Sequence, residues 1–116
     1  MIKFPTKKYS KSNKYFADYI NIKDLLLKKV DQKILLKIIQ MISSTIKKKR
    51  SFFSCGNGGS ATTAEHLTCD FSKGSCTNTN LNIKVSSLNS NVALMTAIAN
   101  DISYDDVFSY QLNRFG

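Results

Sequence analysis

Ser51-Phe52-Phe53-Ser54-Cys55-Gly56-Asn57-Gly58-Gly59-Ser60 is the stretch of sequence that decides the fold. Its first half is a short apolar run of the kind that forms a buried parallel strand. Its second half contains three glycines, which permit positive φ angles and close approach of a ligand, and it ends in a serine that can cap a helix. A strand, a glycine-rich turn and a helix in this order place backbone N–H groups where open α/β sheets bind ligands. The stretch therefore predicts a loop that holds a small polar ligand, with side-chain contacts from Asn57 and Ser60.

Helical and β patterns alternate around this loop. Before it, apolar residues three or four apart predict two amphipathic helices, over 15–30 and 31–50, and Asp31 can cap the second. After it, the patterns predict a helix, a strand and two more helices, over 60–72, 81–86, 92–99 and 105–113. Gly74 should stop the first of these helices, and Asn100-Asp101 should break the next one.

This alternation implies a parallel sheet with right-handed crossovers. Two strands alone make a poor parallel sheet, because both faces and both edges need cover. The chain therefore looks unfinished, and we expect a third strand beyond Gly116.

Length and charge bound the possible functions. The chain has 116 residues, 42% of them hydrophobic, which suits one domain with a modest core. Neither a long apolar run nor a secretory signal is present, so we expect a cytoplasmic protein without a membrane partner. The net charge of +9 is carried mostly by lysine in the front half, away from the loop. We interpret this charge as a solvated surface, with residues 1–14 as a flexible basic N-terminus, and expect no nucleic-acid partner.

The sequence contains three cysteines, Cys55, Cys69 and Cys76. Their odd number and the lack of a secretory signal predict reduced thiols. We expect Cys55, at the end of the first strand, to be a small buried hydrophobic residue. Together with His66, the other two cysteines match no standard zinc spacing.

The loop can be compared with two sequence motifs that bind nucleotides in other proteins. A Walker loop requires Gly-Lys-Ser/Thr, which is absent. The dinucleotide pattern is met formally by Gly56-x-Gly58-x-x-Ala61, but its acidic partner at the end of the second strand is replaced by Ser86-Ser87. We therefore expect no nucleotide cofactor.

His66 and Asp70 are four residues apart on the helix that follows the loop, so they share one face. An imidazole and a carboxylate below a ligand loop can transfer protons, bind a metal ion or form a structural hydrogen bond. Asp101, at the next predicted helix end, can serve as a cap or as part of a site.

These residues carry a resemblance. The loop 54–60, His66 and Ala97-Ile98-Ala99-Asn100-Asp101, followed by Tyr104 and Phe108, resemble the phosphoheptose isomerases of the sugar isomerase (SIS) domain superfamily from about Leu25 onward. The resemblance implies an α/β fold with a SIS-type three-layer parallel sheet, here truncated, preceded by an N-terminal helical pair that packs in a tetramer. Residues 15–116 would then form an incomplete SIS domain whose N-terminal helices span 15–50.

The family's reaction converts sedoheptulose 7-phosphate to D-glycero-D-manno-heptose 7-phosphate for surface polysaccharide, through an enediol. Carried over, the phosphorylated sugar would be contacted by Asn57, Gly58, Gly59, Ser60 and Asp101. His66 and Asp70 would be catalytic, and the same two residues would be zinc ligands, because some members of the family bind zinc.

Two departures from the family pattern qualify this assignment. Asp70 stands where the family has Glu, and a side chain shorter by about 1 Å can cost about 100-fold in rate. The family's Ser/Thr-rich phosphate loop, its other zinc ligands and its second catalytic histidine have no counterpart here. We therefore expect little isomerase activity from these 116 residues alone. The alternatives are a non-catalytic phosphosugar-binding SIS module, as in regulators, and a non-functional remnant.

Overall fold

The computed structural model of the protein describes residues 4, 5 and 7–116. It divides into two compact units, residues 1–39 and 40–116, each of which is described by itself. Four residues of the predicted flexible N-terminus, 1–3 and 6, lie outside the described part of the chain. No helix in the described part is long and apolar enough to cross a membrane.

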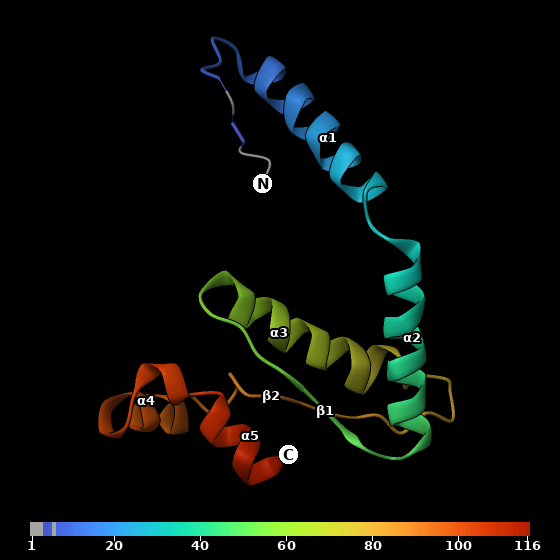
Figure 1. Ribbon diagram of the computed structural model, residues 1–116, viewed down its shortest axis with the longest axis vertical. Coiled ribbons are helices and arrows are strands. Elements are labelled where there is room, and N and C mark those ends of the chain that lie inside the picture. The colour runs from blue at the N-terminus through green and yellow to red at the C-terminus, as the bar shows by residue number, and fades with distance from the viewer. Residues whose placement is uncertain (1–3, 6) are drawn as a thin grey trace. The chain divides into compact units, whose positions relative to one another are not determined.

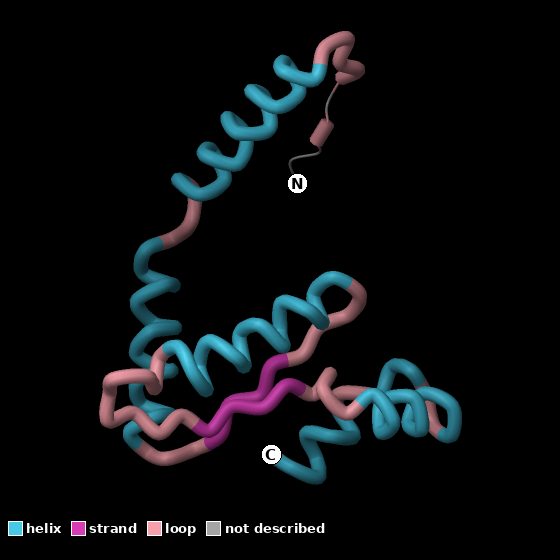
Figure 2. Tube along the Cα trace, turned by 180° about the vertical axis from the view of Figure 1, so that it is seen from behind, coloured by secondary structure: helices cyan, strands magenta, loops and turns pink. Residues whose placement is uncertain are grey.

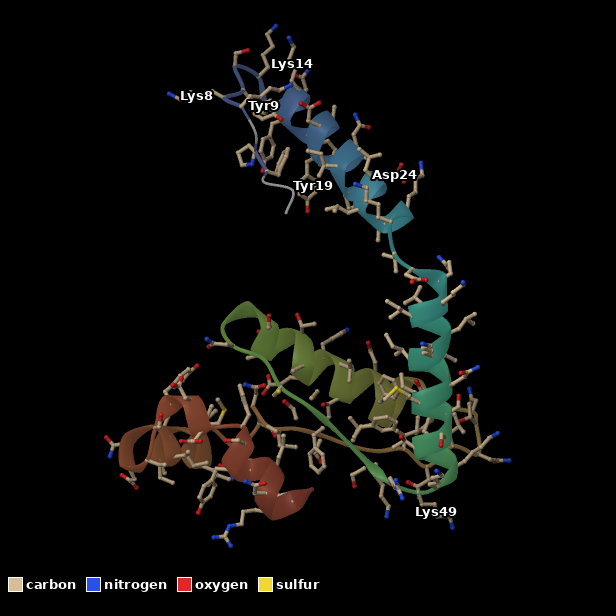
Figure 3. The ribbon with its side chains drawn as sticks, in the orientation of Figure 1. Lys8, Tyr9, Lys14, Tyr19, Asp24 and Lys49 are labelled. Carbon is tan, nitrogen blue, oxygen red and sulfur yellow. The ribbon has the colours of Figure 1, made fainter. Side chains whose placement is uncertain are left out.

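The first unit is built on α1 (Ser12–Lys28) and the first half of α2 (Gln32–Lys47). α1 begins at Ser12, three residues before the predicted start. Asp31 caps α2 as predicted, because its Oδ1 accepts a hydrogen bond of 2.8 Å from the backbone N–H of Lys33. α2 ends at Lys47, so the following basic residues, including Lys49 with its positive φ of 53°, form a turn rather than a last helical turn (Figure 3).

Aromatic side chains fasten the N-terminal segment to the start of α1. The ring of Phe4 lies 5.1 Å from that of Tyr15 and 5.7 Å from that of Tyr19, and Tyr9 meets Tyr15 edge to face. Figure 3 shows Tyr9 beside the start of α1 and Tyr19 on the helix itself. Tyr9 also donates a hydrogen bond of 2.9 Å to Asp18.

The second unit contains a parallel pair of strands, β1 (Ser51–Ser54) and β2 (Lys84–Ser87), in which Ser51 pairs with Lys84 and Ser54 with Ser87. Between them run α3 (Gly59–Cys69) and a π-helical turn (Asp70–Gly74). After β2 come α4 (Val92–Asp101), a 3-10 turn (Tyr104–Asp106) and α5 (Ser109–Phe115). Figure 1 and Figure 2 show α3 lying along the strands, with α4 and α5 on the chain that leaves β2.

The predicted order of elements is confirmed, whereas several boundaries differ. β2 is shorter than predicted, because residues 81–83 do not pair with β1. Gly74 does end the helical segment after the loop, through a π-helical turn in which the N–H of Ser75 reaches the carbonyl of Asp70 at 2.7 Å. Asn100 and Asp101 do not break α4 but form its last two residues, so the helix ends two residues later than predicted.

The core is small and lies in the second unit. Its buried apolar side chains come from α3, from the segments flanking β2, from α4 and from the residue after the 3-10 turn: Ala64, Ile83, Leu88, Ile98 and Val107. Gln111 is buried with them and donates hydrogen bonds to the carbonyls of Leu88 at 3.0 Å and Val107 at 2.8 Å. These bonds join α5 to the end of β2, beside the loop that follows β1.

Candidate functional site

The start of the glycine-rich loop is clamped by a residue outside the motif. Asn89, two residues after β2, accepts a hydrogen bond of 2.9 Å from the N–H of Gly56 and donates one of 2.8 Å to its carbonyl. The Asn89 side chain is only 6% exposed. Both backbone groups of Gly56 are therefore used to fix the loop rather than to meet a ligand. This contact of Asn89 with the loop was not predicted; its signal in the sequence is an amide side chain directly after a buried strand.

The turn into α3 uses its glycines in different ways. Gly58 has a positive φ of 56° and is the N-cap residue, so the prediction that Ser60 caps the helix is wrong. A Cβ on Gly56 would overlap the backbone of Ser60, so this glycine is required for close packing. A Cβ on Gly59 would meet open space. The helix begins one residue earlier than expected because Gly58 supplies the sharp turn.

Asn57, the predicted ligand-contacting side chain of the loop, is held by a residue distant in sequence. Its Oδ1 accepts a hydrogen bond of 2.7 Å from the hydroxyl of Tyr104. Tyr104 opens the 3-10 turn after α4. The loop after β1 is thus tied to the 3-10 turn that follows α4.

His66 and Asp70 share one face of the helix, as predicted. His66 Nε2 lies 3.6 Å from Asp70 Oδ2, and the two side chains are 75% and 64% exposed. This distance suits an ion pair when the imidazole is protonated and is longer than a good hydrogen bond. Asp70 is also the first residue of the π-helical turn, a feature found frequently at functional sites.

The helix that carries this pair is attached to β1 through one hydroxyl. Ser54 Oγ donates a hydrogen bond of 2.9 Å to the carbonyl of Ala64 and lies 3.0 Å from the hydroxyl of Thr68. Ala64 itself is buried against the strands. The position of the His66–Asp70 pair relative to the loop is therefore set by packing between α3 and β1.

The His66–Asp70 pair offers two ligands to a metal ion. Within the described residues, no group of three or more His, Cys, Asp or Glu side chains is close enough to hold a metal. His66 and Asp70 could supply two donors, one nitrogen and one carboxylate oxygen, of the kinds that zinc accepts. A four-coordinate zinc would need further ligands.

The prediction that Cys55 is buried is wrong. This residue is exposed and follows Ser54, the last residue of β1. All three cysteines are free thiols, as predicted.

Asp101, predicted to hold substrate hydroxyls, is the last residue of α4 and is exposed. Its Oδ1 accepts a hydrogen bond of 2.8 Å from the amide of Asn100. Hydrogen bonds from Asn89, before α4, and from Tyr104, after it, connect these flanking segments to the loop.

A cavity of about 520 Å³ lies between α3 and β1, and Cys55 and Ser60, at the two ends of the loop, are part of its lining. Its lining is mainly apolar and includes Phe52, Phe53, Leu67 and Phe71. Such a lining does not fit a phosphorylated sugar, which needs polar partners. The candidate site is therefore the loop with the exposed ends of α3 and α4.

The profile of the SIS domain family matches residues 14–115. The chain belongs to the SIS domain family. Among similar proteins, the phosphoheptose isomerase of Helicobacter pylori is 30% identical over 101 residues, which are 85% of this chain and 52% of that protein. The phosphoheptose isomerase of Colwellia psychrerythraea is 43% identical over 63 residues, which are 54% of this chain and 32% of that protein.

A solved structure of phosphoheptose isomerase from Neisseria gonorrhoeae matches this SIS domain with a TM-score of 0.73 and 26% identity, over 90% of this chain and 53% of that chain. The expected fold class, a SIS-type parallel sheet preceded by helices, is therefore confirmed. The chain spans about half the length of the curated relatives it matches, such as 52% of the Helicobacter pylori protein.

Proposed function

We propose that this SIS domain is the sugar-binding part of a phosphoheptose isomerase-like enzyme. Its substrate would be sedoheptulose 7-phosphate, converted to D-glycero-D-manno-heptose 7-phosphate in heptose biosynthesis for surface polysaccharide. The observation that carries this proposal is the clamped glycine-rich loop after β1, together with the His66–Asp70 pair on the helix that the loop opens. The relatives named phosphoheptose isomerase support the choice of substrate.

The chemistry is a proton shift between adjacent carbons of the open-chain sugar. The Asp70 carboxylate would remove a proton from the carbon next to the carbonyl, which gives an enediolate. The protonated Asp70 would return this proton to the former carbonyl carbon, while the hydroxyl proton moves from one sugar oxygen to the other. His66, whose Nε2 lies 3.6 Å from Asp70 Oδ2, would orient this carboxylate. Asn57, Gly58, Gly59, Ser60 and Asp101 would hold the sugar oxygens around this step.

The family's second histidine has no counterpart among these residues, since His66 is the only histidine. We therefore expect that the 116-residue chain binds the sugar phosphate with little turnover. Zinc would take His66 and Asp70 as ligands and supply a positive charge that polarises the substrate carbonyl.

A homotetramer is part of the proposal. In α1 and α2 no described side chain is buried, and large apolar residues such as Phe16, Leu27 and Ile39 are 58–61% exposed. Apolar helix faces of this kind need a partner surface. The free thiols support a reducing compartment, and we propose the cytoplasm.

The test compares this chain with a complete gene product that contains it, each mixed with sedoheptulose 7-phosphate. Calorimetry should detect binding by both, and NMR of the sugar should show heptose 7-phosphate only with the longer protein. Asp70→Asn in the longer protein should abolish turnover while binding remains. Absence of binding by either protein would exclude the substrate.

A non-catalytic phosphosugar-binding module is the second candidate. The observation in its favour is the exposure of His66 and Asp70, at 75% and 64%, because catalytic pairs usually work in sites shielded from water. Binding without turnover by the complete gene product would favour this candidate.

A further inference from the structure

The hydrogen bond between Tyr104 and Asn57 joins two segments that are 47 residues apart in the chain. It is the shortest of the hydrogen bonds described at the loop, 2.7 Å against 2.8 and 2.9 Å for the Asn89 clamp. Tyr104 is 52% exposed, so its hydroxyl is not fixed by burial. Its role therefore depends on Asn57, the side chain that it contacts.

The backbone of Tyr104 is held firmly on both sides. Before it, the N–H groups of Ile102 and Ser103 both donate to the carbonyl of Ile98 at 3.0 Å. After it, Val107 is 2% exposed and anchors the 3-10 turn in the core. The Ser103 hydroxyl also caps the turn by accepting a hydrogen bond from the N–H of Asp105 at 3.1 Å. The phenol is thus carried on a fixed backbone.

An asparagine amide has one acceptor oxygen and two N–H donors, and these can exchange places by rotation about the side-chain bond. A donor placed at the oxygen selects one orientation. With Tyr104 donating to Oδ1, the Nδ2 group of Asn57 is directed away from Tyr104 and is available to a ligand. The same loop has Gly58 as the N-cap of α3, so the turn around Asn57 is otherwise set by backbone geometry.

We propose that Tyr104 is a positioning residue of the sugar site, which orients the Asn57 amide so that its Nδ2 group donates to an acceptor oxygen of the phosphorylated sugar. The inference rests on the proposed function, because the sugar phosphate is its ligand. Asn89 fixes the backbone of Gly56, and Tyr104 fixes the side chain of Asn57. Two adjacent residues of the loop, Gly56 and Asn57, are therefore held by side chains from the part of the chain after β2. The site is then prepared before the ligand arrives, which lowers the entropy cost of binding.

The first test needs no ligand. In a spectrum of side-chain amides, Tyr104→Phe should shift the Asn57 Nδ2 resonances and speed their exchange with water, because the hydroxyl is lost and the ring is kept. Tyr19→Phe is the matched control, since Tyr19 is 48% exposed and lies on α1 in the other unit. Unchanged Asn57 resonances in Tyr104→Phe would overturn the inference.

The second test is a double-substitution cycle in the affinity for sedoheptulose 7-phosphate. Tyr104→Phe alone should weaken binding about five-fold, the effect of one neutral hydrogen bond. In an Asn57→Ala background the same change should have almost no further effect, because Tyr104 acts through Asn57. An undiminished five-fold loss in that background would overturn the inference.

The outcomes also separate the two proposals. If the unaltered chain does not bind sedoheptulose 7-phosphate, the proposed function fails, whereas the Asn57 resonances still decide whether Tyr104 orients that amide. If the unaltered chain binds and Tyr104→Phe binds equally well, the function stands and the positioning role is refuted.

Discussion

Replacing Asn89 by alanine should destabilise the second unit more than any other asparagine substitution near the loop. The change removes two hydrogen bonds and leaves the N–H and carbonyl of Gly56 without their partner. Each unsatisfied buried group costs about 1–3 kcal/mol. Because Gly56 is half-buried and water can reach it in part, we expect about 2–4 kcal/mol in total.

The assay is urea unfolding followed through the amide resonances of Ile98 and Val107, which are buried in the second unit and report on it alone. Two further asparagine-to-alanine variants calibrate the result. Asn91→Ala removes one helix cap, in which Asn91 Oδ1 accepts from the N–H of Leu94 at 3.0 Å, and should cost about 1 kcal/mol. Asn82→Ala alters an exposed side chain and should stay within about 0.5 kcal/mol.

The reasoning is refuted if Asn89→Ala costs no more than Asn82→Ala. A cost equal to that of Asn91→Ala would mean that only one of the two bonds to Gly56 contributes. In either case the loop would owe its conformation to Gly58 and to the packing of Gly56 on Ser60 rather than to the clamp.

Three further predictions concern other parts of the chain. Gly56→Ala should strongly destabilise the second unit in urea, because its Cβ would overlap backbone, whereas Gly59→Ala should be neutral or better by up to about 1 kcal/mol, since its Cβ meets open space. Asp70→Glu in a complete gene product should raise kcat by up to about 100-fold if the missing 1 Å limits proton transfer; an unchanged kcat would show that the shorter side chain is already well placed. The hydrogen bond and charge of Lys7 hold the pKa of Asp18 below its usual value, so the stability that Asp18 gives α1 is present above about pH 3.9 and is lost as the pH falls through the folded-state pKa; NMR titration of the Asp18 carboxyl should show this pKa rising in Lys7→Ala.

The order of elements could be predicted because it depends on periodicity. Apolar residues spaced three or four apart can form one face of a helix, and a continuous apolar run before glycine suits a buried strand. The boundaries were harder, because they depend on tertiary pairing. Residues 81–83 have the same β-prone pattern as the rest of the predicted strand, yet they extend past the partner strand, which begins at Ser51 opposite Lys84.

The end of α4 illustrates the same limit. Asn100 and Asp101 are poor helix formers, and local propensity therefore predicts a break at this point. In the structure Ile98 is 3% exposed and anchors the last turn, and its carbonyl accepts from both Ile102 and Ser103. Burial of one side chain thus outweighs the propensity of the two residues that follow it.

Some residues of the candidate site belong to a local sequence motif, and others are brought to it by the surrounding fold. The loop residues, His66 and Asp70 could be named from the sequence because their spacing is local. The contacts of Asn89 and Tyr104 with the loop could not be predicted, because these residues reach it across 33 and 47 residues.

Relatives with the same loop can differ in specificity through residues outside it. The glycines set the course of the backbone, and an amide on that backbone can still point either its oxygen or its nitrogen at a ligand. The choice is made from outside the motif, at Tyr104, where exchange of a hydroxyl for a hydrogen changes one contact and leaves the packing in place. A protein that keeps Asn57 and lacks a donor opposite its Oδ1 could turn the carbonyl toward the ligand and so favour a donor hydroxyl of the sugar. Specificity within an unchanged loop can therefore shift through a residue that never touches the substrate.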